Sequence, residues 1–450
     1  MATPGQQGET AHTLREGALQ AVQRLHGAGF TAFWAGGCVR DQVMGRAPSD
    51  YDIATNARPE RVEALFSGSV TVGKSFGVVR APVGEHFYEI ATFRSERGYR
   101  DGRRPSEVRF VDPQTDAARR DFTINALFYD PLTDTVHDYV GGRDDIQRRL
   151  VRCVGDPSER FAEDHLRLLR AVRFSVSLNF ALESATRDAI RAHASLCAKV
   201  APERIRQELT RMLVEAVRAG DVLRLLDETG LLEVILPEVA ALKGQEQPPE
   251  FHPEGDVFTH TVGMLDRMKD RDPQLAYAVL LHDIGKPLTA CVHTDRVRFN
   301  GHASQGARVA EELLRRLRFS AEDIRVITHC IRNHMRFMDV RRMRDAKVRR
   351  LVGSPTFPIE LELHRLDCLA SHGDLANVAF LEQFREKLAA EPVLPEPWVS
   401  GHDILQMGVP EGPAVGRWRR EAYDAQLDGR CRDRDELLAW LRSRMEASGS

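Results

Sequence analysis

The sequence contains no uninterrupted apolar run of the roughly 18 residues that a membrane-spanning helix needs. Its first residues also lack the cationic start and the apolar stretch of a secretory signal peptide. The seven cysteines are widely spaced and form no C-x-x-C pair, which argues against a zinc ribbon, a thioredoxin-like redox motif and a dense disulfide framework. We therefore expect a cytoplasmic protein that is neither exported nor inserted into a membrane.

Neither sign of charge dominates, because 63 Lys and Arg residues face 66 Asp and Glu residues and leave a formal net charge of -3. The whole-chain charge gives no reason to expect a polyanionic partner, so any nucleic-acid surface must be local. Apolar residues make up 42% and charged residues 29%, which excludes a disordered or fibrous chain. With 450 residues the chain exceeds a single hydrophobic core, so two to four domains are expected.

Strand signals are confined to the first third of the chain. After a helix predicted over residues 14–28, β-rich runs such as FTAFWAGG, YDIAT and HFYEIATF alternate with turns as far as residue 139, and Gly84-Glu85 marks a hairpin tip. Beyond about residue 145, long Leu, Arg, Glu and Ala stretches with helical spacing replace them.

Two polar, proline-bearing segments, 243–256 and 391–401, are typical of linkers. The sequence therefore predicts an α+β protein of four regions: a mixed α/β head at 1–145, a helical neck and body at 146–245, a third region at 246–378 and a helical tail at 379–450.

Acidic residues recur on predicted strands of the head. In SDYDIAT, a strand would place Asp50 and Asp52 on one face, and HFYEIATFR would add Glu89 between two apolar neighbours. Three carboxylates from two strands can hold two divalent ions for phosphoryl transfer, although two solvated acids at a strand end are the commoner meaning of D-x-D alone. Upstream, FWAGGCVRD places Gly36, Gly37 and Arg40 at a strand-to-helix turn, where backbone N–H groups and a guanidinium can approach a phosphate.

Two further polar motifs follow. RRDFTINAL supplies Arg120, Asp121 and Asn125, which alone could be a capped helix start with surface arginines. EDHLRLLRAVRF places Asp164, Arg167 and Arg170 on the polar side of a predicted amphipathic helix, where Asp164 and Arg167 could simply form an i,i+3 ion pair.

The motifs GGCVRD, DYDIAT, EIATFR, RRDFTINAL and EDHLRLLRAVRF occur in an order and spacing that resembles the class II tRNA nucleotidyltransferase (CCA-adding) and bacterial poly(A) polymerase family. The resemblance runs from about residue 30 to about residue 240 and extends more loosely to the C-terminus. It implies a polymerase-β-like nucleotidyltransferase head and an enzyme that adds or repairs the 3′-terminal CCA of tRNA, or its terminal A, from CTP and ATP without a nucleic-acid template. Two Mg²⁺ ions would assist the reaction, and pyrophosphate would be released.

The resemblance also implies roles for single residues. Asp50, Asp52 and Glu89 match the catalytic acids, of which the first two bind Mg²⁺, and Gly36, Gly37 and Arg40 match the triphosphate site. Arg120, Asp121 and Asn125 match the motif that contacts phosphate and the ribose 2′-hydroxyl. The nucleotide-binding set is completed by residues that match a protein template for the base: Asp164, Arg167 and Arg170.

An arginine-rich segment, RSERGYRDGRRPSEVRF, lies between Thr92 and Val111 and contains several helix and strand breakers. Its composition predicts a mobile loop. In the related enzymes the loop at this position is linked to the switch from C to A addition, so its presence favours terminal A addition but does not distinguish full CCA addition from A addition alone.

Histidines and aspartates recur through the third region. LLHDIGKP places His282 next to Asp283, His260 precedes them, and Asp367 follows in LHRLDCLASHGD, with Asp374 as an alternative. Imidazole and carboxylate ligands suit a divalent transition metal. The ordered set resembles an HD phosphohydrolase domain, in which His302 and His334 could bind a second metal or a phosphate.

A local excess of positive charge lies in RNHMRFMDVRRMRDAKVRR, residues 332–350, which suits tRNA phosphates, although a helix that exposes its polar face would look similar. The RNA-binding residues predicted there are Arg341, Arg342, Arg344, Lys347, Arg349 and Arg350. Two other functions stay open at this level: a poly(A) polymerase, and a metal-dependent phosphohydrolase that acts on phosphoesters at the HD site. The oligomeric state is not indicated.

Overall fold

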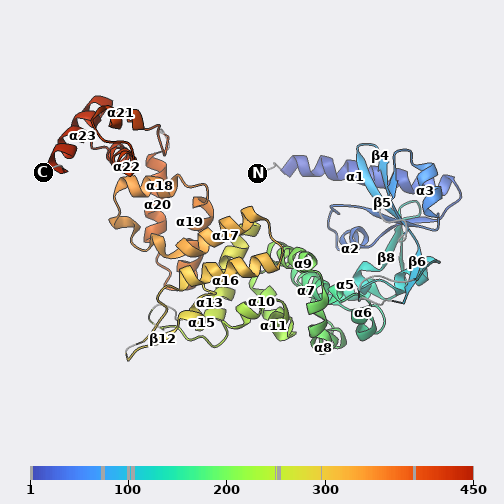
Figure 1. The fold of residues 1–450 in the computed structure, drawn as a ribbon. Helices are drawn as coiled ribbons and strands as arrows, with labels where there is room; N and C mark the ends of the chain where they lie inside the picture. The colour runs from blue at the N-terminus through green and yellow to red at the C-terminus, as the bar shows by residue number, and fades with distance from the viewer. Residues whose placement is uncertain are drawn as a thin grey trace. The chain divides into compact units, whose positions relative to one another are not determined.

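A computed structural model of the chain describes residues 4–71, 77–98, 102, 107–248, 250, 255–294, 296–388 and 392–448. The chain divides into two units, Met1–Ala240 and Ala241–Ser450, each held by its own internal contacts (Figure 1). Strands concentrate before residue 145 and helices follow, which confirms the predicted α+β fold. No helix within the described ranges is both long enough and apolar enough to cross a bilayer.

A seven-stranded mixed sheet forms the centre of the first unit, in the order β3-β4-β5-β2-β1-β8-β9. β2 runs parallel to β5 and antiparallel to β1, and Gly84 and Glu85 join β4 to β5 as predicted. The strands are β1 (Ala32–Ala35), β2 (Asp52–Thr55), β3 (Val70–Thr71), β4 (Val78–Val83), β5 (His86–Thr92), β8 (Leu127–Asp130) and β9 (Thr135–Asp138).

The two faces of this sheet have different neighbours. Trp34, Ile53 and Ile90 are buried on the face that α1 (Pro4–Gly27) covers, and the Tyr88 hydroxyl donates a hydrogen bond to Leu14 of α1. Because side chains alternate along a strand, the opposite face carries Asp52 and Glu89 together with a core of Phe33, Phe93 and Phe128. α1 begins ten residues before the predicted helix at residue 14, since a proline is compatible with a first helical turn and no later residue breaks the helix.

The helices of the first unit lie before, between and after the strands of this sheet. Besides α1 these are α2 (Gly37–Val43), α3 (Pro59–Leu65), α4 (Pro113–Ala118), α5 (Gly142–Arg148), α6 (Pro157–Glu163), α7 (Leu166–Leu178), α8 (Ser184–His193), α9 (Pro202–Glu215), α10 (Gly220–Glu228), α11 (Leu231–Ile235) and α12 (Pro237–Ala240), with 3₁₀ turns at Thr123–Asn125 and Ala194–Lys199. A short parallel pair also forms between β10 (Leu150–Val151) and β11 (Ala181–Leu182). α7 is almost wholly buried and packs against α9, so it fixes the side chains that leave its first turn.

The arginine-rich segment predicted as a loop contains two strands. β6 (Arg94–Arg97) pairs with β7 (Glu107–Phe110) in an antiparallel hairpin, so the prediction of a loop over the whole segment is wrong at both ends. Strand pairing satisfies the backbone groups of these polar residues, which lack the apolar alternation that would have signalled a strand. Residues 99–101 and 103–106, at the tip of the segment, lie outside the described residues. The prediction that this tip is mobile therefore stays a prediction.

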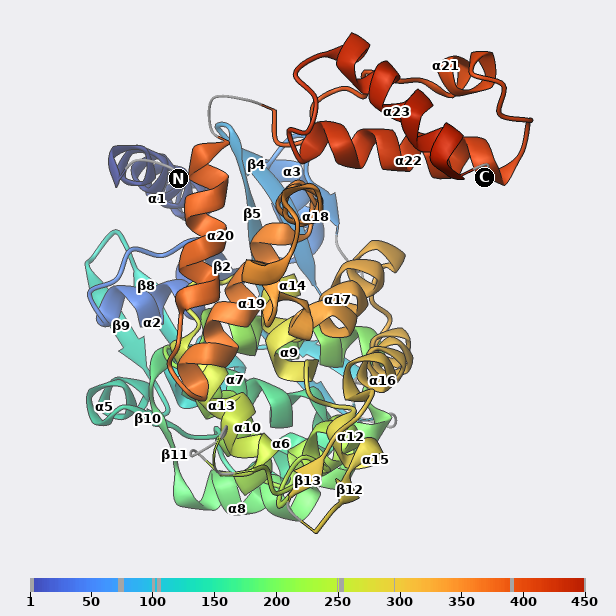
Figure 2. The same cartoon turned by 90° about the vertical axis from the view of Figure 1, so that its left-hand side faces the viewer.

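The second unit is helical in its described residues apart from one short hairpin, β12 (Cys291–Val292) with β13 (Val297–Arg298) (Figure 2). Its helices are α13 (Val257–Arg267), α14 (Pro273–Leu281), α15 (Lys286–Thr289), α16 (His302–Arg316), α17 (Ala321–Asn333), α18 (Asp345–Val352), α19 (Phe357–Ala370), α20 (Ala376–Lys387), α21 (Gly401–Gln406), α22 (Pro413–Leu427) and α23 (Arg434–Ser448), with 3₁₀ turns at His334–Phe337 and Val340–Arg342. The last three helices share an apolar core that includes Trp418, Leu437 and Leu441.

Candidate functional site

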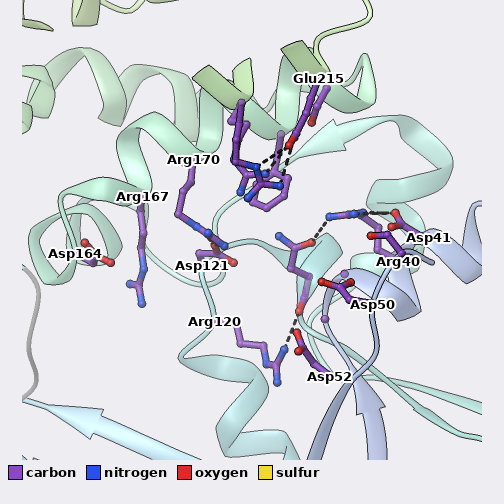
Figure 3. A pocket seen from close by; sticks show the side chains of 18 of the residues that line it. Arg40, Asp41, Asp50, Asp52, Arg120, Asp121, Asp164, Arg167, Arg170 and Glu215 are labelled. Carbon is purple, nitrogen blue, oxygen red and sulfur yellow. Dashed lines mark hydrogen bonds and ion pairs between the residues drawn. The ribbon is translucent and has the colours of Figure 1, made fainter. Parts of the chain in front are cut away.

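A cavity of about 570 Å³ opens in the first unit where β1 ends and β2 begins. Most of the site residues predicted in the head and the neck line it, and Figure 3 shows many of them pointing into the same space. These residues are Gly36, Gly37, Arg40, Asp50, Asp52, Arg120, Asp121, Asn125, Asp164, Arg167 and Arg170. Glu89 does not line the cavity.

The acidic side chains meet because of the strand order. β2 pairs in parallel with β5, with Ile53 opposite Ile90, so Asp52 lies beside Glu89 on the same sheet face. Asp50 precedes the strand, which begins only at Asp52, and the prediction that both acids lie within one strand is therefore wrong for Asp50. Partial desolvation beside the cavity, followed by the charges of Asp50 and Glu89, raises the pKa of Asp52 to about 6, while Arg120 opposes the shift.

Carboxylates that repel one another in this way fit a divalent cation. Ionised acids offer hard oxygen ligands, and Mg²⁺ prefers a few carboxylates together with substrate phosphates. Among the described residues near Asp52, Arg120 is the cation that lowers its pKa, and burial and the acids outweigh it. The donor set of Asp50 and Asp52, with Glu89 beside them, therefore suits a hard divalent ion.

Arg40 and Asn125 form a polar wall next to the acids. Arg40 donates to the Asn125 side-chain oxygen at 2.8 Å and to the Asp41 carboxylate at 2.9 Å. The buried amide nitrogen of Asn125 donates to no described residue, so its hydrogens remain for a ligand. Gly36 adopts a φ of +78°, and a Cβ there would lie 3.3 Å from the Arg120 guanidinium, so a side chain would be strained and crowded.

One buried carboxylate holds two arginines at the cavity. Asp116, on α4, accepts from Arg119 at 2.7 Å and from Arg120 at 3.1 Å, and it also accepts from the backbone N–H of Arg94 at 3.0 Å. Burial alone would raise the pKa of Asp116, but Arg120 and Arg119 lower it below its usual range. Asp116 therefore stays ionised and fixes both guanidinium groups.

Asp121 is also held by arginine. Its carboxylate accepts from Arg170 Nε at 2.8 Å and from the backbone N–H of Phe122 at 2.8 Å. Burial would raise the pKa of Asp121, but Arg170 and Arg167 outweigh it and leave the pKa below its usual value. An ionised acceptor therefore faces the cavity.

The helix predicted through EDHLRLLRAVRF is broken at its polar end. α6 ends at Glu163, Asp164 is extended with φ -135° and ψ 104°, and α7 begins at Leu166, so the prediction of one continuous helix is wrong. Arg167 pairs with Glu163 at 2.7 Å, and Asp164 accepts from Arg204 of α9 at 3.4 Å. The break turns Asp164 and Arg167 into the cavity as an acceptor and a donor.

The two chemical halves of the cavity are separated. In Figure 3, Asp50 and Asp52 lie at one side, Asp164 and Arg167 at the other, and Asp121 and Arg170 between them. A ligand with an anionic end and a hydrogen-bonding end could span this order of groups.

Several lining residues were not predicted: Asp41, Arg119, Arg173, Phe174, Ser177, Arg204, Arg211 and Glu215. Arg204 and Arg211 stand seven residues apart on α9 and therefore share a helix face, which is the one sequence signal that could have indicated them. Their approach to the cavity depends on the packing of α9 against α7.

The predicted histidines and aspartates of the second unit converge within it. The ligand atoms of His260, His282 and Asp283 lie within 4.8 Å of one another, and so do those of Asp283, His302 and His334. Asp367 lies at the edge of this cluster, with its carboxylate 3.1 Å from His260 Nε2. The alternative acid, Asp374, instead accepts from the backbone N–H of Ala376 at 2.8 Å.

The tautomers of these imidazoles favour a cation. Nδ1 of His282, His302 and His334 each lies 2.7 to 2.9 Å from a backbone carbonyl oxygen and must donate to it. The Nε2 lone pairs then face Asp283 at 3.0, 3.5 and 3.8 Å, respectively. Burial also lowers the pKa of His334 to about 4, so this imidazole is neutral and able to bind a metal at neutral pH.

The predicted basic segment, 332–350, is not one helix. It comprises the end of α17, two 3₁₀ turns and most of α18. The side chains of Arg341, Arg342, Arg344, Lys347 and Arg350 are exposed, and that of Arg349 is half-buried.

Three family models match the chain in succession. The poly A polymerase head domain matches residues 32–152, the probable RNA- and SrmB-binding site of polymerase A matches residues 179–243, and the HD domain matches residues 256–370. The first match covers the cavity residues from Gly36 to Asn125, the second covers α9, and the third covers the histidine cluster, whereas Asp164, Arg167 and Arg170 lie between the first two matches.

Curated relatives and solved structures agree with these matches. The chain is 46% identical to the CCA-adding enzyme of Lactobacillus helveticus over 43% of this chain and 49% of the relative, and 42% identical to that of Bacillus velezensis over 51% and 57%. It thus spans about half the length of the curated relatives it matches. The Bacillus stearothermophilus CCA-adding enzyme in complex with CTP has a TM-score of 0.73 at 27% identity and covers 96% of this chain and 98% of that structure.

A Thermotoga maritima CCA-adding enzyme complexed with tRNA shares the fold, with a TM-score of 0.62 at 18% identity over 95% of this chain and 94% of that structure. The order of the three matched domains, the likeness to the Bacillus stearothermophilus structure over almost the whole chain and the converging polar motifs agree. The chain therefore contains a poly A polymerase head domain followed by an HD domain, and it is similar in fold to CCA-adding enzymes over almost its whole length.

Proposed function

We propose that this protein is a tRNA nucleotidyltransferase that adds or repairs the 3′-terminal CCA, or its terminal A, from CTP and ATP and releases pyrophosphate. The observation that carries the proposal is the head cavity, in which the acid pair Asp50 and Asp52 and the donor–acceptor pair Asp164 and Arg167 face one space. We further propose that it works in the cytoplasm.

The acidic end of the cavity suits the reacting phosphate. Asp50 and Asp52 would hold Mg²⁺, with Glu89 as the third acid. When bound, the metal neutralises the triphosphate and lowers the pKa of the RNA 3′-hydroxyl. Arg40 and Arg120 would orient the triphosphate beside the turn at Gly36 and Gly37, where Asn125 offers an unused amide.

The opposite end suits the sugar and the base. The ionised carboxylate of Asp121 can accept a hydrogen bond from a ribose 2′-hydroxyl, with Arg170 beside it. Asp164 can accept from the exocyclic amino group that cytosine and adenine share, and Arg167 can donate to a ring nitrogen or carbonyl. Selection by side chains removes the need for a nucleic-acid template. The helical neck and body, 146–245, would perform this selection, and the tail, 379–450, with the basic segment before it, would bind tRNA.

The decisive assay offers tRNA transcripts that lack CCA, CA or A, with labelled CTP or ATP added separately. Extension of the first two by CTP and of the last by ATP is expected from a complete CCA-adding enzyme, and extension of only the last from an A-adding enzyme. If a folded sample extends none of them, the proposal is wrong. A product much longer than mature tRNA would instead assign a poly(A) polymerase.

A second candidate activity is favoured by the histidine cluster. His260, His282, Asp283 and Asp367 would hold a divalent transition metal, with His302 and His334 available for a second ion or a phosphate. Lys286 lies 2.6 Å from Asp283 in the same cavity of about 380 Å³, so a phosphoester could bind there and be hydrolysed. Asp52→Ala should abolish nucleotide addition and spare hydrolysis, whereas Asp283→Ala should do the reverse. Loss of both activities in either variant would contradict two separate sites.

A further inference from the structure

A buried lysine stands beside the histidine and aspartate cluster of the second unit. Lys286 begins α15 and is 6% exposed, although lysines are rarely buried without partners. Its ammonium lies 2.6 Å from Asp283 Oδ2 and donates to the side-chain oxygen of Gln247, also at 2.6 Å. The centroid of the Phe299 ring lies 5.4 Å from the same nitrogen. One of the three ammonium N–H groups therefore has no acceptor among the described residues, in a side chain that lines the cavity of about 380 Å³.

The backbone of Lys286 is fixed by the glycine before it. Gly285 packs so closely against α16 that a Cβ there would collide with the carbonyl oxygen of His302 and the backbone nitrogen of Gly306. The backbone N–H of Lys286 also donates to the carbonyl oxygen of Asp283 at 2.9 Å. Because the start of α15 is held in this way, the acceptors around the ammonium decide where its charge lies.

Gln247 comes from the first of the two predicted linkers, yet it is only 7% exposed. Two hydrogen bonds close this segment onto the start of α13. The backbone N–H of Gly244 donates to the Asp256 carboxylate at 2.6 Å, and that of Val257 donates to the carbonyl oxygen of Gln245 at 3.1 Å. Gln247 is therefore held against the cavity by the fold of its own segment.

The carboxylate of Asp283 divides its two oxygens between different groups. Oδ2 faces Lys286 and lies 3.0 Å from His282 Nε2. Oδ1 lies 3.5 Å from His302 Nε2 and 3.8 Å from His334 Nε2, and it accepts no hydrogen bond from a described residue. A metal ion held by this carboxylate would share its ligand with the ammonium, and repulsion between the two cations lowers metal affinity unless the ammonium is held back.

We propose that Gln247 is a positioning residue of the HD site, which shares the Lys286 ammonium with Asp283 and leaves one N–H for a phosphate oxygen of the substrate. A neutral amide suits this task, because it holds the ammonium without cancelling the charge that attracts a phosphate. A carboxylate in its place would form a full ion pair and compete with that phosphate. An apolar side chain would leave the ammonium to Asp283 alone.

This inference rests on the second activity proposed above, the hydrolysis of a phosphoester at the HD site. It adds a residue that precedes the matched HD domain, residues 256–370, and it gives the phosphate a named donor. Metal binding can be measured without hydrolysis, so failure of the activity and failure of the inference are distinguishable.

The test uses the full chain with Gln247→Met, which removes the acceptor, and Gln247→Glu, which keeps an acceptor and adds a charge. Gln245→Met is the matched control, because Gln245 belongs to the same segment, does not line the cavity and donates to the neighbouring carbonyl of Glu246 at 3.4 Å. Co²⁺ is the probe, followed by visible absorption, which responds to imidazole ligands. None of the described residues that line the head cavity is a histidine, so this signal reports the second unit.

The two variants should change the site in different ways. Gln247→Met should bind Co²⁺ roughly tenfold more weakly, because the ammonium then pairs with Asp283 alone. Gln247→Glu should bind Co²⁺ at least as tightly as the wild type, but its KM for bis(p-nitrophenyl) phosphate at saturating Co²⁺ should rise roughly tenfold, because the ammonium is neutralised. In a Lys286→Met background, Gln247→Met should change Co²⁺ affinity by no more than about twofold, since the two effects act through the same ammonium.

The inference is overturned if both variants weaken Co²⁺ binding, if neither differs from Gln245→Met, or if Gln247→Met has the same effect with and without Lys286. Weaker Co²⁺ binding in both variants together with equal losses of melting temperature would show that Gln247 only supports the fold. If the wild type gives no imidazole signal with Co²⁺, the proposed metal site fails and the inference fails with it. If the wild type binds Co²⁺ but hydrolyses no phosphoester, the second activity fails, and the inference that Gln247 prepares a phosphate site fails for that reason, whatever the Co²⁺ affinities are.

Discussion

Asp52→Asn is expected to stabilise the metal-free protein while abolishing its activity. The pKa of Asp52 rises from 3.8 to about 6 in the folded chain, so the folded state binds this proton more tightly than the unfolded state. Below about pH 4 the group is protonated in both states and costs nothing. As the pH rises to 6 and beyond, ionisation of Asp52 lowers the stability of the folded state, and asparagine avoids that cost.

The magnitude follows from the shift. Two pKa units correspond to at most about 3 kcal/mol, and because the side chain is open to the cavity, solvent screening reduces the expected gain to about 1 kcal/mol. For a unit of this size, that raises the melting temperature by roughly 2 to 4 °C. Calorimetry in EDTA at pH 8 should show the gain, and it should vanish at pH 4.

Two comparisons make this result specific. Asp144→Asn removes an exposed carboxylate of the same unit that does not line the cavity, and it should leave the melting temperature nearly unchanged. Excess Mg²⁺ should stabilise the wild type more than Asp52→Asn. The reasoning is refuted if Asp52→Asn melts at or below the wild-type temperature at pH 8 without metal, or if Mg²⁺ stabilises both proteins equally.

Three further changes test other parts of the head cavity. Asp164→Ala should lower kcat/KM for CTP and ATP by roughly 100-fold, because the acceptor for the base amino group is lost. This is measured by steady-state kinetics with all four nucleotides, and the assignment is contradicted if CTP and ATP keep their advantage over UTP and GTP. Gly36→Ala should lower the free energy of unfolding in urea by about 1 to 3 kcal/mol, since φ is +78° there. It should also raise the KM for nucleotides. An unchanged free energy of unfolding would mean that the turn tolerates a side chain. Asp116→Ala should destabilise the protein by about 3 kcal/mol, because Arg119 and Arg120 lose their shared buried carboxylate. If its melting temperature falls no further than that of Asp144→Asn, Asp116 does not hold these two arginines.

The local pattern of the sequence predicted the polar motifs well. Alternation along a strand placed Asp52 and Glu89 on the face opposite the buried Ile53 and Ile90, and the structure has them so. The glycine turn after a strand also needed only local chemistry, since Gly36 adopts a backbone conformation that other residues rarely take.

The rest depends on contacts between residues far apart in the sequence. The parallel pairing of β2 with β5 brings Asp52 beside Glu89, and no local pattern in the sequence specifies that these two strands are neighbours. The sequence did not indicate the helix break at Asp164, because the apolar spacing continues across it. At the break, Nδ1 of the buried His165 lies 2.9 Å from the carbonyl oxygen of Phe161. Arg204 reaches Asp164 only through the packing of α9 against α7.

The most direct test of the central claim is the length of the product made from tRNA without CCA when all four nucleotides and Mg²⁺ are present. The account predicts that the wild type lengthens the RNA only to the mature 3′ end, or, as an A-adding enzyme, extends only tRNA that already ends in CC. It also predicts that Asp52→Asn extends neither. Extension by Asp52→Asn at the wild-type rate would contradict the claim that this acid pair carries nucleotide transfer.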